Sequence, residues 1–203
     1  MTTTRDTLLG RIRDAGDSAA WEEFFALYAP LLEGYARVLG LGRADAEEVR
    51  DECLAVVAAR IADFRYDRTK GTFKGWLHRI ARGKVLDAMR RSGVRRAREE
   101  RPATEAWLSL PDARDGPDRV WEERWRSEHL RFALDEVRRA KDERGREIVD
   151  LLLDDALGAA EIGARAGLSP NQVYKLRSKL VREVRDVLAR IGETGDENPG
   201  IGG

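Results

Sequence analysis

A polar loop and the helix predicted to follow it carry the residues with the clearest chemistry in this chain. The loop at residues 65–71 places basic side chains around one aromatic ring, and Thr72 supplies an oxygen that can cap a helix. Basic groups bind phosphates, and an exposed ring can stack on an unpaired base. We therefore predict a surface that binds nucleic acid. Its residues are Arg65, Tyr66, Arg68, Lys70, Thr72, Lys74, Arg79, Arg82 and Arg90.

The helix expected after Thr72 has one apolar and one basic side. Projected at roughly 100° per residue, its apolar side chains share one arc, and His78 falls on the opposite arc with the arginines. The apolar arc consists of Phe73, Trp76, Leu77, Ile80, Ala81, Val85 and Ala88. A solvated basic face on an ordinary helix would show the same pattern. The distribution of charge along the chain helps to decide between that alternative and a nucleic-acid surface.

Residues 157–182 are the second stretch with a recognisable chemistry. Gly167 can form a tight turn, Ser169 can cap the next helix, and Pro170 suits its first position. This spacing is typical of a helix-turn-helix, whose second helix enters the major groove of DNA. A helical hairpin that binds nothing is the alternative. The side chains expected to reach bases or phosphates are Ser169, Asn171, Gln172, Lys175, Ser178 and Lys179.

Charge is segregated along the chain, although the formal net charge is zero. Residues 60–101 hold 14 Lys/Arg against 5 Asp/Glu, and residues 165–190 hold 7 against 2. The stretches on either side of the first basic block are net acidic. Two separated basic blocks indicate two contact points on a polyanion, with an affinity that falls as salt rises.

Residues suited to catalysis or metal binding are few. The two histidines, His78 and His129, lie on different predicted helices, and the single cysteine, Cys53, lies in an apolar stripe. These residues supply neither a zinc cluster nor a Cys/His pair, and the sequence has no phosphate-binding loop that ends in Gly-Lys-Ser/Thr. We therefore predict a protein that is not an enzyme and that needs no metal or other cofactor.

Two long helices are expected to precede the basic loop. The first begins with a cap at Asp17 or Ser18 and carries a stripe of aromatic and leucine side chains. The second is predicted to begin at Asp45, with Glu48 completing a capping box. Its early residues form an acidic side that either favours the helix dipole or contacts a partner protein. This acidic side consists of Glu47, Glu48, Asp51 and Glu52.

The predicted fold class is all-α, with two small helical domains joined by a flexible linker and a helix-turn-helix in the C-terminal one. We expect a first domain at residues 1–96, a linker at 97–117, a second domain at 118–191 and a disordered tail at 192–203. The linker is rich in Arg, Glu and Pro and has no sustained period. The sequence shows no signal peptide and no apolar run approaching 18 residues, so we expect a cytoplasmic protein without membrane insertion.

The order of these motifs resembles bacterial sigma factors of the extracytoplasmic-function (ECF) type, in the sigma-70 superfamily. The resemblance rests on AEEVRDECL, YDRTKGTFKGWLHRIARGKVLDAMRR, REIVDLLL and LGAAEIGARAGLSPNQV, and covers roughly residues 5–96 and 130–190. It implies two domains, called region 2 and region 4. In the family, region 2 docks on the RNA polymerase clamp and melts the minus-ten promoter element, and region 4 reads the minus-thirty-five element.

The resemblance also implies partners and roles. Core RNA polymerase and promoter DNA are the expected partners, and an anti-sigma protein is a further candidate. By resemblance, the acidic side at residues 47–52 would face polymerase, and the loop at residues 65–72 would capture a flipped base. The chain departs from the family pattern at Arg50, Gly83 and Gln172. Two alternatives therefore stay open: a helix-turn-helix transcriptional regulator, and a sigma-like adaptor that does not initiate transcription.

Overall fold

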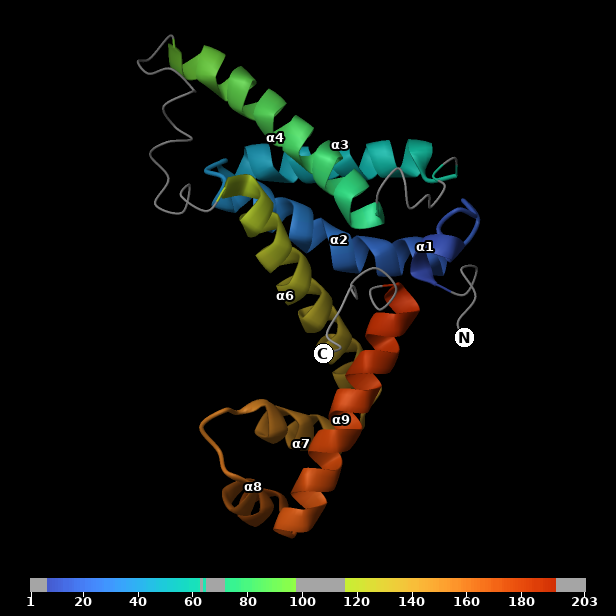
Figure 1. Cartoon of the computed structure of the whole chain (residues 1–203), viewed down its shortest axis with the longest axis vertical. Helices are drawn as coiled ribbons and strands as arrows, with labels where there is room; N and C mark the ends of the chain where they lie inside the picture. The colour runs from blue at the N-terminus through green and yellow to red at the C-terminus, as the bar shows by residue number, and fades with distance from the viewer. Residues whose placement is uncertain (1–6, 63, 65–71, 98–115, 193–203) are drawn as a thin grey trace, which may run out of the picture. The chain divides into compact units, whose positions relative to one another are not determined.

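The computed structural model describes residues 7–62, 64, 72–97 and 116–192. Within these ranges the regular structure is α-helical, which confirms the predicted all-α class (Figure 1). The helices are α1 (Leu8–Arg11), α2 (Ser18–Val38), α3 (Arg43–Arg60), α4 (Phe73–Ala97), α6 (Gly116–Arg139), α7 (Glu143–Leu153), α8 (Ala159–Ala166) and α9 (Pro170–Ile191). They form two compact units, one within residues 8–128 and one mainly of residues 129–192.

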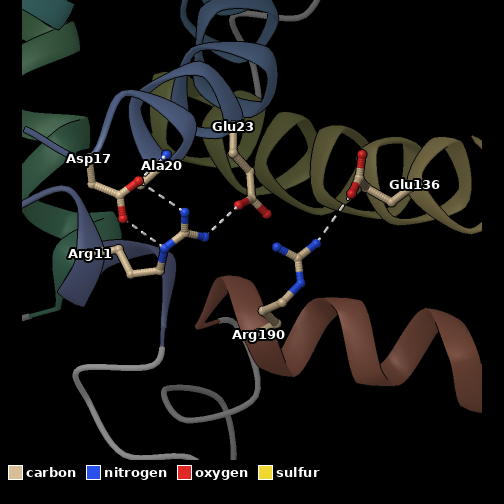
Figure 2. Close-up of polar contacts among 6 residues, drawn as sticks. All are labelled: Arg11, Asp17, Ala20, Glu23, Glu136 and Arg190. Carbon is tan, nitrogen blue, oxygen red and sulfur yellow. Dashed lines mark hydrogen bonds and ion pairs between the residues drawn. The ribbon is translucent and has the colours of Figure 1, made fainter.

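Helix α2 forms the centre of the first unit. The Asp17 carboxylate accepts a hydrogen bond from the Ala20 amide at 2.8 Å, so Asp17, rather than Ser18, is the cap. Figure 2 shows Arg11 of α1 holding both Asp17 and Glu23 at 3.1 Å. Most of the aromatic stripe is packing, as predicted, because Phe24, Tyr28, Leu31, Leu32 and Tyr35 are all buried. The prediction for Phe25, which the periodicity placed in the same stripe, is wrong, because its side chain is 45% exposed.

Helix α3 begins earlier than the sequence predicted. Its N-cap is Gly42, which makes no side-chain cap, and Asp45 lies inside the first turn. The expected capping box of Asp45 and Glu48 is therefore wrong. Asp45 instead accepts a hydrogen bond from the Ser92 hydroxyl of α4 at 3.1 Å. The left-handed Gly40, with φ of 91°, ends the preceding turn and lets α3 start three residues later.

Helix α4 packs its apolar arc on α2 and α3. Thr72 caps it as predicted, because its hydroxyl accepts the Gly75 amide hydrogen at 3.1 Å. Leu77, Ala81 and Val85 have no measurable exposure. The first half of α6 also belongs to this unit, where Trp121 and Trp125 are buried.

The second unit is built from the remainder of α6 with α7, α8 and α9. Arg190 of α9 pairs with Glu136 of α6 at 3.3 Å (Figure 2). Arg144 of α7 donates to the carbonyl oxygen of Ala166, at the end of α8. The buried core consists of Ala133, Val137, Val149, Leu152, Leu157, Ile162, Val173, Leu180 and Val184. Among the helices in the described ranges, every one is too short or too polar to traverse a lipid bilayer.

Candidate nucleic-acid interface

The residues predicted to bind nucleic acid around α4 divide into three groups. Arg65, Tyr66, Arg68 and Lys70 lie outside the described residues. Arg79 and Arg90 are exposed, and the side chain of Arg90 pairs with Asp87, one turn earlier on the same helix, at 3.0 Å. Lys74 and Arg82 instead face acidic residues of α6. The outward basic face that the periodicity predicted is therefore only partly exposed.

Lys74 is the most enclosed of these cations. Its ammonium group lies 2.6 Å from a Glu122 carboxylate oxygen and 5.7 Å from the centre of the Trp125 ring. Only 14% of its side chain is accessible to solvent. Arg82 lies eight residues later on α4, at 3.8 Å from Asp118, and 53% of its side chain is exposed. A phosphate could reach Arg82 directly, whereas it would have to displace Glu122 from Lys74.

His78 lies between these two cations and is covered, although its place in the periodicity suggested exposure. Its ring stacks on Trp121 at 4.9 Å between centres and 18° between planes. Its Nε2 lies 3.2 Å from the Tyr35 hydroxyl and 3.7 Å from Asp118. Desolvation lowers the pKa of His78, and the negative charge of Asp118 opposes part of that change. The imidazole is thus held mainly in its neutral form.

The predicted polymerase-binding acids of α3 face two directions. Glu48 and Glu52 point toward α4, where Arg91 contacts them at 3.3 Å and 3.2 Å, respectively. Glu52 also binds Lys84 at 3.0 Å, and the hydrogen bond from Lys84 lowers the pKa of Glu52. These two carboxylates therefore hold α3 against α4.

Glu47 and Asp51 form the other acidic pair. Each binds an arginine of its own helix at 2.8 Å, Glu47 through Arg43 and Asp51 through Arg50. Arg50 also reaches Glu33 of α2 at 3.2 Å, so this departure from the family pattern ties α3 to α2. Asp51 keeps 67% of its side chain exposed, which leaves this side of α3 accessible to a partner.

The helix-turn-helix is formed by α8, the turn at Gly167 and α9. Gly167 has a φ of 66°, in the left-handed region that favours glycine, as predicted. The Ser169 hydroxyl accepts the Gln172 amide hydrogen, and the Gln172 side-chain oxygen accepts the Ser169 amide hydrogen at 2.7 Å. This capping box fixes the start of α9. It also occupies the carbonyl oxygen of Gln172, a residue predicted to read bases.

Gly163 is a second glycine that this motif requires, and sequence reasoning missed it. A Cβ at this position would lie 2.5 Å from the carbonyl oxygen of Leu168, which is too close for any side chain. The same backbone approach brings the Leu168 amide to 2.8 Å from the Gly163 carbonyl oxygen. Its signal was available as a glycine on the apolar side of a short predicted helix, four residues before the turn glycine.

The outward side of α9 keeps most of its predicted residues accessible. Asn171, Lys175 and Ser178 are exposed, and the part of the chain that the structure describes offers their side chains no hydrogen bond or ion pair. Tyr174 joins them with 60% exposure, a residue that was not predicted. The sequence signal for Tyr174 was an aromatic residue among polar positions, three residues after Asn171.

Lys179 occupies a different side of α9. It lines a pocket of about 180 Å³ between α7 and α9, together with Leu176, Leu180 and Glu183. Its ammonium group lies 3.9 Å from Glu183, which Lys141 of the preceding loop holds at 2.7 Å. Lys179 thus lies on the side of α9 that faces α7, whereas Asn171, Tyr174 and Lys175 are exposed to solvent.

Comparisons with known proteins show the family of the chain. Residues 24–95, from α2 through α4, match the family described as Sigma-70 region 2. The ECF RNA polymerase sigma factor SigF of Caulobacter vibrioides is 30% identical over 155 residues, which cover 76% of this chain and 77% of SigF. The chain belongs to the ECF sigma factor family.

Other similar proteins carry the same family name. The ECF RNA polymerase sigma factor SigE of Mycolicibacterium smegmatis is 29% identical over 178 residues, covering 86% of this chain and 65% of SigE. The ECF RNA polymerase sigma factor RpoE of Cereibacter sphaeroides is 27% identical over 173 residues, covering 85% and 88%. A solved structure of CnrH in complex with the cytosolic domain of CnrY aligns with 92% of this chain and 98% of that chain, at 19% identity and a TM-score of 0.36.

The region 2 match of this ECF sigma factor contains both the acidic helix α3 and most of the basic helix α4. The match ends before α6, so Asp118, Trp121 and Glu122 lie outside it. Among the described residues, no three His, Cys, Asp or Glu side chains converge to hold a metal ion. Cys53 is buried, and burial raises the pKa of its thiol to about 12, so it remains protonated at neutral pH.

Proposed function

We propose that this ECF sigma factor binds core RNA polymerase and directs it to promoters. The observation that carries the proposal is the capped helix-turn-helix, whose second helix presents Asn171, Tyr174, Lys175 and Ser178 to solvent near its start. Such a helix fits the major groove, where amide, hydroxyl and ammonium groups distinguish base pairs. The family name of the similar proteins supports polymerase as the partner.

The two basic surfaces would divide the work on promoter DNA. Helix α9 would read the duplex at the minus-thirty-five element. Arg79, Arg82 and Arg90 of α4 would bind phosphates at the minus-ten element, and the loop at residues 65–72 would hold an unpaired base. This division follows from the chemistry, because a melted strand needs a ring with nearby cations and a duplex needs a helix in its groove.

Polymerase would dock on the side of α3 that the fold leaves accessible. Glu47 and Asp51 pair with arginines of α3 itself, while Glu48 and Glu52 are bound by side chains of α4. We therefore assign the docking role mainly to Glu47 and Asp51. Glu48 and Glu52 would act by holding α3 in place.

We further assign residues 1–96 to region 2, 97–117 to a linker, 118–191 to region 4 and 192–203 to a tail. The region 2 match at 24–95 supports the first assignment. The two compact units divide inside α6, so α6 contributes residues to both. We propose that the protein acts in the cytoplasm without catalytic chemistry of its own. An anti-sigma protein is a third proposed partner, and co-purification with the full chain tests it.

Transcription in vitro tests the main proposal. Core polymerase is combined with the full chain and a library of promoter fragments, and initiation at a common pair of sequence elements is the expected result. Core polymerase alone is the control. A chain that binds single duplexes but never directs initiation would instead be a helix-turn-helix regulator.

Variants of α9 test groove reading in the same assay. Asn171→Ala should change the preferred base at one position by about 1–3 kcal/mol, while Lys179→Ala should weaken all sequences alike. Gln172→Ala also removes a capping oxygen, so Gln172→Glu, which keeps an acceptor for the Ser169 amide, is its matched variant. Equal losses on every sequence for Asn171→Ala and Lys179→Ala would contradict the groove-reading role.

One observation favours a second function, that of a sigma-like adaptor that binds polymerase without opening promoters. Lys74 and Arg82, two predicted phosphate contacts, face acids of α6. An adaptor would form the polymerase complex and yet fail on duplex promoters. A template with a pre-melted bubble separates the two functions, because initiation on the bubble alone indicates lost melting and initiation on both indicates a sigma factor.

A further inference from the structure

The first half of α6 lies over one row of α4. We call Lys74, His78 and Arg82, which are spaced by four residues, the α4 row. We call Asp118, Trp121, Glu122 and Trp125 the α6 cover. Glu122 lies 2.6 Å from Lys74, and the Asp118 oxygen lies 3.7 Å from His78 and 3.8 Å from Arg82. Anionic oxygens of the chain thus stand beside each basic group of the row.

Aromatic packing holds the cover in register. Trp121 lies 5.2 Å from Tyr35 and 4.9 Å from His78, and Trp125 lies 5.6 Å from Tyr28, all between ring centres. Trp121 and Trp125 are 1% and 5% exposed. Contacts of this extent give α6 a defined position on α2 and α4 within the first unit.

One feature of the α6 cover is energetically unfavourable. The indole nitrogen of Trp121 is buried, and no hydrogen-bond acceptor for it lies among the residues that the structure describes. A buried donor without a partner favours any state in which water can reach it. The carboxylates of Asp118 and Glu122 remain 77% and 43% exposed, so competing ions can approach them. The α6 cover therefore has a defined position on the α4 row and can also separate from it.

We propose that the α6 cover is an internal competitor for the minus-ten DNA backbone. Carboxylate oxygens and phosphate oxygens bind the same ammonium and guanidinium groups, so Glu122 and a phosphate cannot both occupy Lys74. Arg82 is open to a phosphate already, but promoter DNA binds the whole α4 row, Lys74 included, only after the first half of α6 has moved away. This regulation rests on the proposed function, because it concerns the surface that we assign to promoter phosphates.

The test removes the negative charge of the cover while keeping its shape. The full chain carrying Asp118→Asn with Glu122→Gln is compared with Glu123→Gln with Asp135→Asn. This control neutralises two other carboxylates of α6, which pair with Arg119 and Arg131 of the same helix. Both variants change the net charge equally, so any general loss of repulsion between protein and DNA cancels.

Binding is measured by fluorescence anisotropy at 50 mM salt, with a labelled 20-nucleotide single strand of mixed sequence and with its duplex. The cover variant should bind the single strand about three- to tenfold more tightly than the control variant. Adding Lys74→Gln should then remove most of this gain. Acylation of Lys74 by an amine-reactive ester, followed by mass spectrometry, should be faster in the cover variant.

The outcomes separate the two proposals. Equal affinities of the cover and control variants would overturn the internal competition while leaving the proposed promoter binding in place. Failure of every variant to bind either probe would overturn both. Tighter binding with unchanged acylation of Lys74 would also contradict the inference, because the gain would not come from uncovering that residue.

Discussion

The basic residues of α4 and the polar residues of α9 differ in how far the chain itself already binds them. On α4, Lys74 contacts Glu122, Lys84 contacts Glu52, and Arg91 contacts two acids of α3. On α9, Asn171, Tyr174 and Lys175 extend into solvent. One surface is assembled by internal ion pairs, and the other is presented for contact.

This difference shows why a charge count overstates a binding surface. Residues 60–101 carry the larger excess of basic side chains, yet several of those side chains hold helices together. The excess still raises the local potential, which attracts a polyanion at a distance. Direct contact, however, requires side chains that the fold has left accessible. Residues 165–190 have the smaller excess and the more accessible polar face.

The largest expected effect removes the ring on which the α6 cover depends. Trp121→Ala deletes a buried indole, so it should lower the free energy of unfolding by about 3–5 kcal/mol. Denaturant unfolding followed by circular dichroism measures this change. Trp121→Phe keeps a ring against His78 and removes the indole donor that lacks a partner, so it should cost much less. If both variants unfold like wild type, the α6 cover contributes nothing to the stability of the first unit. The statement that α4 is bound by other parts of the chain, whereas α9 is not, would then lose its main support.

A change in the second unit should follow in size. Gly163→Ala forces a Cβ against the Leu168 carbonyl oxygen, so we expect a loss of about 1–3 kcal/mol and weaker binding to every duplex. Gly158→Ala is the control, because no atom lies within 4 Å of its added Cβ. Thermal melting ranks the two variants. Equal melting temperatures for Gly163→Ala and Gly158→Ala would show that the turn tolerates a side chain.

The two acidic pairs of α3 offer a finer separation. Glu48→Lys with Glu52→Lys should destabilise the first unit, because each new cation faces Arg91 or Lys84. Glu47→Lys with Asp51→Lys should leave the fold nearly unchanged and weaken binding to core polymerase. Each partly exposed ion pair is worth roughly 0.2–1 kcal/mol. Melting curves and polymerase pull-down of both double variants measure the contrast, and undiminished binding by the folded Glu47/Asp51 variant would remove the docking assignment.

The smallest expected effect concerns pH. The pKa of His78 is lowered in the folded state, so the unfolded chain takes up a proton more readily. Stability from this residue is therefore complete above its ordinary pKa of about 6.5 and is lost as the pH falls through the folded value. His78→Gln should flatten the decline in melting temperature between about pH 7 and pH 5. Parallel curves for the variant and wild type would show that His78 is protonated equally in both states.

Local features of this fold were predictable from sequence, and partnerships between distant residues were not. Caps at Asp17, Thr72 and Ser169 depend on a few neighbouring residues, and all three were predicted. The cap at Asp45 failed because two nearby glycines allowed α3 to begin earlier. Periodicity also identified the buried stripes, since apolar burial repeats with the helical turn.

The candidate site was predictable in composition rather than in exposure. Nothing in a single helix indicates that Lys74 meets Glu122, which lies 48 residues away. Periodicity likewise predicted the same polymerase-binding role for all four acids of α3, because they all lie opposite the apolar stripe. It could not separate Glu48 and Glu52 from Glu47 and Asp51. The acids of α6 repeat at the four-residue spacing of the α4 row, but that match becomes informative only once the helices are known to touch. The roles of Arg65, Tyr66, Arg68 and Lys70 stay predictions.

The solitary thiol of Cys53 makes the first unit able to report on its own opening. It has no measurable exposure, and its raised pKa keeps it unreactive in the closed state. A disulfide reagent can therefore modify it only during excursions that separate α3 from its neighbours. When reclosing is faster than the chemistry, the labelling rate equals the intrinsic thiol rate multiplied by the opening equilibrium constant. Each 1.4 kcal/mol of opening free energy then slows modification tenfold. The rate at which a coloured leaving group is released therefore measures the opening free energy of the first unit without any engineered probe.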